Sequence, residues 1–161
     1  MCRSCGVKYF EMSHLFSQWG ATAAPKIMGY ENGGLRRLFG WETPAVGEEY
    51  ASFLRKFLVS FTEELRKLGI EKCSYFHISD EPSLEQLESY QAARALVKDC
   101  LQDFPIIDAL SNYDFYERGI VEEPICSNDH IGPFLENPPQ KLWTYYCTAQ
   151  WKDVSNRFIV Q

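Results

Sequence analysis

The chain has 161 residues, of which 45% are hydrophobic and 15% aromatic, so it can bury a substantial core. Its net charge of −6 and its lack of any basic run argue against nucleic acid as a partner. No apolar stretch approaches the roughly 20 residues that span a bilayer, and the first residues lack the apolar core of a signal peptide, so we expect no membrane partner.

The first predicted strand covers residues 7–12 (VKYFEM). Polar and aromatic residues follow it directly, among them His14, Gln18 and Trp19. From there an irregular stretch with several glycines is predicted to continue to Trp41. Loops of this length are uncommon in compact domains and usually carry function. The residues of this loop are therefore candidates for a binding site.

A long amphipathic helix is predicted over residues 45–68. Thr43 and Pro44 are typical of a helix start, and Gly69 is typical of a helix end. One face of this helix is charged, and the other is apolar and rich in aromatic residues. We interpret the apolar face as core packing; it consists of Val46, Tyr50, Phe53, Phe57, Phe61, Leu65 and Leu68.

The stretch 72–83 (KCSYFHISDEPS) has the strongest functional pattern. Residues 73–78 are rich in aromatic and β-branched types and predict a short buried strand. The strand is followed by two adjacent carboxylates, Asp80 and Glu81. Ser83 and the glutamine three residues later predict a capping box at the start of the next helix. Acids at this junction stand where α/β barrels place catalytic groups.

Two interpretations of the acid pair are open from this pattern alone. In the first, Asp80 caps the helix and Glu81 lies in its first turn, where the helix dipole favours an acid. In the second, the two neighbouring carboxyl groups resist ionising together, so one keeps its proton while the other stays charged. Such a pair supplies a general acid beside an anionic stabiliser, as the cleavage of a glycosidic bond requires.

The second half of the chain alternates helices and strands. A helix predicted over 84–101 precedes a strand over 106–110, a shorter strand near 124–127 and a last strand over 142–147 (LWTYYC). Strands that alternate with helices across short turns predict βαβ units and a parallel sheet. The sequence shows no internal repeat or domain boundary, so a single α/β domain is predicted over 1–161.

The six cysteines do not form a disulfide or metal-site pattern. Cys2 and Cys5 make an isolated CxxC without a second such pair. The other cysteines fall in or beside predicted strands or on the buried side of a helix, where a thiol acts as a small hydrophobe. We therefore expect a reducing, cytoplasmic location and no metal or cofactor.

Five segments of the chain carry a family resemblance: YFEMSHLFSQWGATAAPKI, RLFGWET, YFHISDEPS, FPIIDALSNYDFY and LWTYYC. In this order they resemble the barrel domain of glycoside hydrolase family 123 and its relatives of the domain-of-unknown-function 4091 type. The resemblance covers nearly the whole chain. Its most specific part is HISDEP, at the junction of a predicted strand and helix.

The resemblance implies a (β/α)₈ barrel and a β-N-acetylhexosaminidase, with N-acetylgalactosaminides as the favoured substrates. In such enzymes the 2-acetamido oxygen of the substrate attacks the anomeric carbon, giving an oxazolinium intermediate and overall retention; this is an exception to the scheme of two protein carboxylates. By this resemblance Asp80 orients and stabilises the acetamido group. Glu81 protonates the leaving oxygen and later activates water.

The length of the chain departs from the family pattern. A complete barrel needs about 250 residues, whereas five strands are predicted here, which correspond to the third to seventh barrel strands. We therefore expect an incomplete barrel domain with about five parallel strands and flanking helices. Its two unpaired edges, near 7–12 and 142–147, predict self-association of the chain.

Glycosidase pockets combine aromatic faces, which pack on the C–H patches of a sugar ring, with polar groups that bind hydroxyls. Residues of both kinds lie in the long first loop or at predicted strand ends. The substrate-binding candidates are His14, Gln18, Trp19, Trp41, Asn112, Tyr113, Tyr145 and Tyr146.

Two alternative functions remain open from the sequence. A barrel metallohydrolase would collect ligands at strand ends. The residues available for this role are His77, Asp80, Asp108, Asp129 and His130. The second alternative is a truncated relative that binds carbohydrate without cleaving it, or that is inert. Bound metal would favour the first alternative, and sugar binding without turnover would favour the second.

Overall fold

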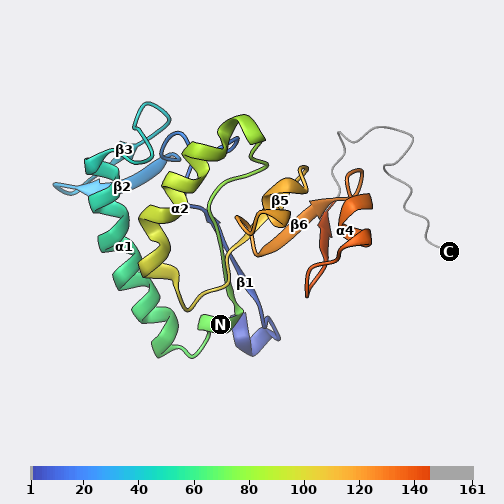
Figure 1. Cartoon of the computed structure of the whole chain (residues 1–161). Coiled ribbons are helices and arrows are strands. Elements are labelled where there is room, and N and C mark those ends of the chain that lie inside the picture. Colours follow the sequence, from blue (N-terminus) through green and yellow to red (C-terminus); the bar gives the residue numbers. More distant parts are fainter. Residues whose placement is uncertain (1, 146–161) are drawn as a thin grey trace.

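The computed structural model describes residues 2–145 and shows parallel strands alternating with helices (Figure 1). β1 (Phe10–His14) pairs in parallel with β4 (Ser74–His77). β5 (Ile107–Leu110) and β7 (Trp143–Tyr145) pair in parallel with the two sides of β6 (Glu123–Ser127).

One parallel bridge, between Phe76 and Ile106, connects the β1–β4 pair to the β5–β6–β7 group. At this bridge the Phe76 amide donates a hydrogen bond of 2.9 Å to the Pro105 carbonyl. The predicted parallel order of the first three of these strands is therefore confirmed. Within residues 2–145 the strands do not close into a barrel.

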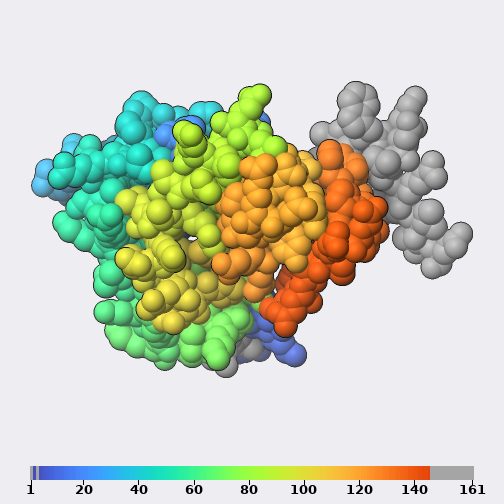
Figure 2. Space-filling model, viewed as in Figure 1, coloured from blue at the N-terminus to red at the C-terminus, as the bar shows by residue number. Residues whose placement is uncertain are grey.

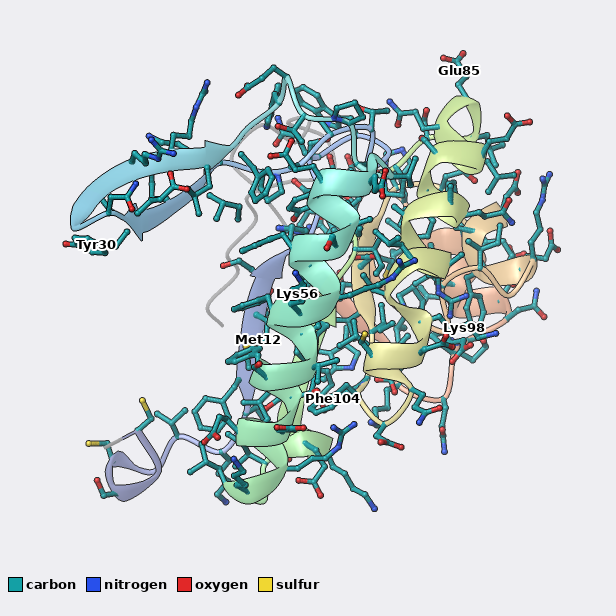
Figure 3. All side chains as sticks on the ribbon, turned by 90° about the vertical axis from the view of Figure 1, so that its left-hand side faces the viewer. Met12, Tyr30, Lys56, Glu85, Lys98 and Phe104 are labelled. Atoms are coloured by element: carbon teal, nitrogen blue, oxygen red, sulfur yellow. The ribbon has the colours of Figure 1, made fainter. Side chains whose placement is uncertain are left out.

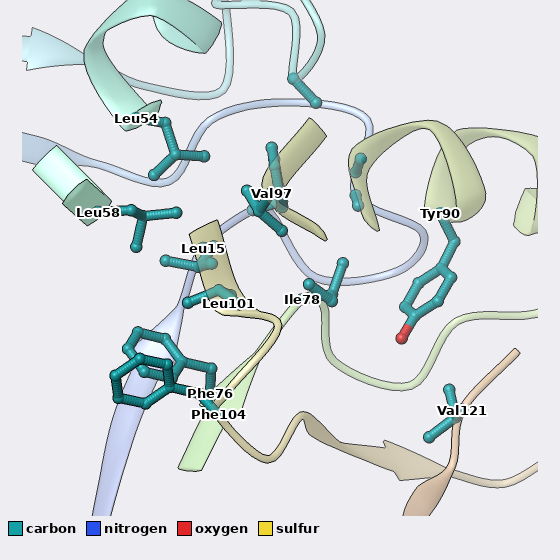
Figure 4. Packing of buried hydrophobic residues seen from close by; sticks show 14 of the residues in the cluster. Leu15, Leu54, Leu58, Phe76, Ile78, Tyr90, Val97, Leu101, Phe104 and Val121 are labelled. Atoms are coloured by element: carbon teal, nitrogen blue, oxygen red, sulfur yellow. The ribbon is translucent and has the colours of Figure 1, made fainter. Parts of the chain in front are cut away.

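Two long helices cover one side of these strands, α1 (Glu48–Lys67) and α2 (Leu87–Leu101). In the space-filling view α2 lies between α1 and the region of β5 and β6 (Figure 2). The core lies between the helices and β4 (Figure 4), and burial of each large apolar side chain in it stabilises the fold by about 1.5–3 kcal/mol. Its fully buried members include Leu54, Leu58, Phe76, Val97 and Leu101.

The remaining helical elements are short. They are η1 (Cys2–Cys5), η2 (Glu71–Cys73), η3 (Leu84–Gln86), α3 (Asp114–Glu117) and α4 (Gly132–Glu136). None of the helices in the described part is long and apolar enough to cross a membrane. The cysteines of this part are free thiols.

The prediction that the long first loop is irregular is wrong. The loop contains an antiparallel hairpin of β2 (Ile27–Glu31) and β3 (Gly34–Phe39). Asn32 and Gly33 form its turn with positive φ angles of 52° and 81°. Two such residues match the backbone twist of a hairpin, and Asn-Gly is a strong sequence signal for it. The hairpin projects from the body of the molecule with Tyr30 near its tip (Figure 3).

The apolar face of α1 was only partly predicted. Leu54 and Leu58 are buried at its centre, whereas Phe57 is 44% exposed. Phe57 stacks between Phe53 and Phe61, with ring centroids 6.1 and 5.4 Å away. The stacked rings lie to one side of the buried leucines and line an apolar groove of about 520 Å³. Other residues that line this groove are Met12, Ile27, Met28 and Leu38.

The outer edge of β1 and this groove predict self-association. No strand of the described part pairs with that edge, which leaves backbone donors and acceptors open beside an apolar surface. We expect light scattering to show dimers or larger species of the purified chain. Phe57→Lys should shift the chain toward monomer, because it places a charge in the groove.

Val59→Lys is the matched control for this prediction. Val59 belongs to the same helix and is 50% exposed, but it does not line the groove. A monomeric chain, or an equal effect of the two substitutions, would contradict the prediction.

Candidate active site

The end of β4 is fixed by hydrogen bonds to the segment that follows β1. The Phe16 amide donates to the Ile78 carbonyl at 3.1 Å, and the Trp19 amide donates to the Asp80 carbonyl at 2.8 Å. The Ser79 hydroxyl donates to the Ser17 carbonyl at 2.9 Å. These contacts continue the β1–β4 pairing beyond the regular strands, so the backbone of Asp80 is held in place.

The chain leaves the strand direction directly after Asp80. Glu81 has a φ of 42°, which is uncommon for a residue with a side chain. Such conformations cost about 1–3 kcal/mol and cluster at functional sites. Neighbouring side chains of a regular strand point to opposite faces. Because the backbone turns at Glu81, the side chains of Asp80 and Glu81 need not point to opposite faces of the sheet.

The helix after the acid pair is capped by a different residue. Ser83 and Gln86 form the predicted capping box, in which the Ser83 amide donates to the Gln86 side-chain oxygen at 3.0 Å. The interpretation of Asp80 as the helix cap is therefore wrong. Glu81 also lies outside the first helical turn. Neither carboxylate is used by the helix, and both are half-buried at the strand end.

Glu81 is held in an environment that favours its protonated form. Burial raises the pKa of Glu81, and the charge of Asp80 raises it further. The Ser111 hydroxyl, 3.5 Å from Glu81 Oε1, and the side chain of His130 oppose this shift, while Asp129 adds to it. The net result is a raised pKa, as a general acid requires.

Ser111 was not among the predicted site residues. It follows β5 directly, so its place at a strand end was the signal available in the sequence. A serine there has no distinctive pattern, because serine is common wherever strands end in turns.

A buried network lies beneath the acid pair. Asp108 is fully buried on β5 and accepts hydrogen bonds from the Ile78 amide at 3.0 Å and the Tyr90 hydroxyl at 2.5 Å. His77 lies between two carboxylates, with Nδ1 3.4 Å from Asp108 and Nε2 2.8 Å from Glu11. Burial acts to lower the pKa of His77, but these carboxylates outweigh it and raise the pKa overall.

His14 packs against His77 of this network, and the charge of Asp80 reaches it. Its ring centroid lies 4.7 Å from that of His77. Burial lowers the pKa of His14 and the charge of His77 lowers it further, while Asp80, Asp108 and Glu11 act in the opposite direction. The net shift is downward, so His14 stays neutral near pH 7 and can both donate and accept a hydrogen bond.

Among the predicted binding residues, Trp19 contacts the acid pair, and it does so through its backbone. Trp19 is 55% exposed, and its amide contacts Asp80. Trp41 is 62% exposed in the loop after β3. The Asn112 side chain accepts a hydrogen bond from the backbone in α3, and Tyr113 packs against Phe134 with ring centroids 5.0 Å apart.

The other predicted binding residues are less well defined. Gln18 is half-buried beside Trp19. Tyr145 is half-buried at the end of β7, and the predicted residue Tyr146 lies outside the described residues.

The metallohydrolase alternative has no ligand set in residues 2–145, where no group of three or more His, Cys, Asp and Glu side chains could hold a metal ion. The large apolar groove beside α1 also differs from the polar strand-end site. Of the predicted site residues it includes only His14.

The chain matches, over residues 1–161, the family model described as glycoside hydrolase 123, catalytic domain. No curated protein matches it. Among solved structures, it is similar to a family 123 glycoside hydrolase from Clostridium perfringens that was studied for glycolipid glycan hydrolysis. The identity is 19% and the TM-score 0.54, and the match covers 79% of this chain but 24% of that one. At this identity the similarity concerns the fold.

Proposed function

The chain belongs to the glycoside hydrolase 123 catalytic-domain family, and from this premise we propose that it is the acid-bearing part of a β-N-acetylhexosaminidase domain. The proposed substrates are carbohydrates that end in a β-linked 2-acetamido sugar, with N-acetylgalactosaminides favoured. The reaction is hydrolysis with retention of configuration at the anomeric carbon.

In the proposed mechanism the two carboxyl groups have different tasks. Glu81, in its protonated form, donates its proton to the glycosidic oxygen as the bond to the anomeric carbon breaks. The 2-acetamido oxygen forms the new bond to that carbon, and Asp80 accepts a hydrogen bond from the acetamido N–H and stabilises its growing positive charge. Glu81, now ionised, then takes a proton from the water that opens the oxazolinium ring.

The observation that carries this proposal is the geometry of the acid pair. The backbone turns out of the strand at Glu81, while the following helix is capped by Ser83. The two half-buried acids are therefore available for catalysis, although helix capping was the simpler expectation for them. The raised pKa of Glu81 beside Asp80 fits the division into acid and stabiliser.

We further propose that the parallel strands of this chain are consecutive units of a (β/α)₈ barrel and that 1–161 forms one incomplete barrel domain. The chain spans 24% of the length of the solved relative. In a complete barrel, side chains from the remaining strand ends would close the sugar pocket.

The test compares a bicyclic analogue of the proposed intermediate with a sugar that has a hydroxyl in place of the 2-acetamido group. The chain is titrated with the thiazoline of N-acetylgalactosamine, which imitates the bicyclic intermediate, and with galactose, while amide signals of residues 79–81 are followed by NMR. We expect the thiazoline to bind at the acid pair and galactose to bind at least roughly tenfold more weakly. Equal binding of both, or shifts confined to other regions, would contradict the proposal.

The second candidate is a relative that binds the same sugar without cleaving it. The observation in its favour is that the described strands do not close into a barrel. An assay with an aryl N-acetyl-β-galactosaminide, on a protein in which this domain is complete, separates the two candidates, because only the first releases the phenol.

A further inference from the structure

The turn at the end of β6 is tied in place next to the acid pair. The Asn128 amide donates to the Tyr145 carbonyl at 2.9 Å, and the His130 amide donates to the Ser127 carbonyl at 3.0 Å. Asp129 accepts a hydrogen bond from the Ser127 hydroxyl. Backbone and side-chain contacts thus fix the turn 127–130 before any ligand arrives.

This turn also contacts the ring of His130. Asp129 Oδ1 lies 3.0 Å from His130 Nδ1. The hydrogen bond from Ser127 and, after it, the contact with His130 lower the pKa of Asp129, although burial opposes this shift. A carboxylate can only accept, so His130 Nδ1 donates a hydrogen bond to Asp129, and with the ring proton on Nδ1 the Nε2 atom is the acceptor of the imidazole. The His130 side chain is 53% exposed, so it is accessible to a ligand.

The turn 127–130 follows β6, and the neighbouring strand β5 is followed by Ser111, which contacts Glu81. Leu110 of β5 is paired with Cys126 of β6, so Ser111 and Ser127 follow as neighbours across a strand spacing of about 4.8 Å. The Ser111 hydroxyl lies 3.5 Å from Glu81. Asp129 raises the pKa of Glu81 and His130 lowers it, so both side chains lie close enough to interact with Glu81.

Two further polar atoms at this edge need a partner. Asn128 Oδ1 and the Tyr145 hydroxyl are buried and have no hydrogen-bond partner among the described residues. Such atoms in native proteins mark positions taken by ordered water or by a ligand. Together with His130 they give the β6–β7 edge more hydrogen-bonding capacity than the described protein uses.

We infer that the turn 127–130 is a hydroxyl-binding subsite for the sugar cleaved at Glu81, in which His130 Nε2 accepts a hydrogen bond from one ring hydroxyl. Asp129 acts as a positioning residue, since it orients the imidazole and holds the proton on Nδ1. The inference rests on the proposed function, because it assumes a sugar whose glycosidic oxygen lies at Glu81. It adds a specificity-determining residue to that site.

Two substitutions of one residue separate the nitrogen atoms of the ring. Glutamine places its amide near the position of Nε2, whereas asparagine places its amide near that of Nδ1. His130→Gln should therefore keep most of the affinity of the chain for N-acetylgalactosamine. His130→Asn should weaken it about fivefold to tenfold, the effect of one lost hydrogen bond. NMR titration of the full chain measures both, and amide spectra check that each variant is folded.

Deoxy sugars identify the partner hydroxyl. N-acetylgalactosamine lacking the hydroxyl at C3, C4 or C6 is titrated against wild type and His130→Asn. For one of the three sugars the two proteins should bind equally, because the interaction is already absent, while the other two sugars keep the difference. A purely structural role of His130 would weaken binding of all the sugars alike.

The outcomes separate the two proposals. If wild type binds no N-acetylgalactosamine, the proposed function and the subsite both fail. If wild type binds the sugar but His130→Asn binds it equally well, or no deoxy sugar removes the difference, the subsite fails and the proposed function stands.

Discussion

Glu81→Gln is expected to lower kcat/KM on aryl N-acetyl-β-galactosaminides by roughly a hundredfold to ten-thousandfold, the usual contribution of a general acid–base group. The measurement requires a protein in which this domain is complete. Glutamine keeps the size and polarity of the side chain but has no proton to give. The loss should therefore be greatest with poor leaving groups, such as an alkyl or sugar alcohol, and smallest with an acidic phenol.

Asp80→Asn is the matched control for this prediction. It makes the same acid-to-amide change in the neighbouring residue, but Asp80 acts on the acetamido group and not on the leaving oxygen. Its effect should therefore vary little between good and poor leaving groups. If both variants show the same dependence on the leaving group, or Glu81→Gln retains full activity, the assignment of Glu81 as the acid is wrong.

The pH profile gives a second readout of the same assignment. Burial and the charge of Asp80 raise the pKa of Glu81, so its proton is kept to higher pH than in an ordinary glutamate. The rate on poor leaving groups should fall as pH rises through this raised pKa. Asp80→Asn removes one cause of the shift, so the falling limb should move to lower pH.

The parallel order and the place of Asp80 and Glu81 between a strand and a helix could be predicted from the sequence because both depend on local patterns. The alternation of strand and helix is set by short-range periodicity, and the Ser83 capping box is a motif of four residues. The hairpin also has a local signal, since Asn32 and Gly33 favour a tight turn between two strands. Other glycines surround this pair in the sequence, and glycines spread over a segment equally indicate an irregular loop.

Other features could not be predicted, since they depend on contacts between distant parts of the chain. Which side of α1 is buried depends on where α2 and the hairpin lie, and aromatic residues satisfied the apolar pattern equally well. The pairing of His77 with Asp108 joins two strands that are about thirty residues apart in the chain. A histidine inside a strand pattern carries no sign of its partner.

Asp108→Ala is expected to destabilise the chain by about 3–5 kcal/mol in the free energy of unfolding, far more than a substitution on the surface. The carboxylate of Asp108 accepts from Ile78 and Tyr90 and faces His77, and all of these groups are buried. Alanine leaves a buried amide, a hydroxyl and an imidazole without this partner. Urea unfolding followed by circular dichroism measures the change.

Two other substitutions define the cause of that loss. Asp108→Asn keeps an acceptor for the Ile78 amide and a polar contact to Tyr90, so it should cost less than alanine. Asp103→Ala removes an aspartate of which 56% is exposed and which pairs with Arg66, and should cost about 1 kcal/mol or less. If Asp108→Ala is no more harmful than Asp103→Ala, the buried network does not stabilise the fold.

The same network predicts how stability changes with pH. The folded state raises the pKa of His77 above its ordinary value of 6.5, because Asp108 and Glu11 outweigh burial. The folded chain therefore binds this proton more tightly than the unfolded chain. The resulting stabilisation is complete below pH 6.5 and is lost as pH rises through the raised pKa. Wild type should thus become less stable across this interval, and Asp108→Asn should show a smaller loss, since only Glu11 then holds the imidazolium. A wild-type stability that rises with pH over this interval would show that His77 is neutral in the folded chain.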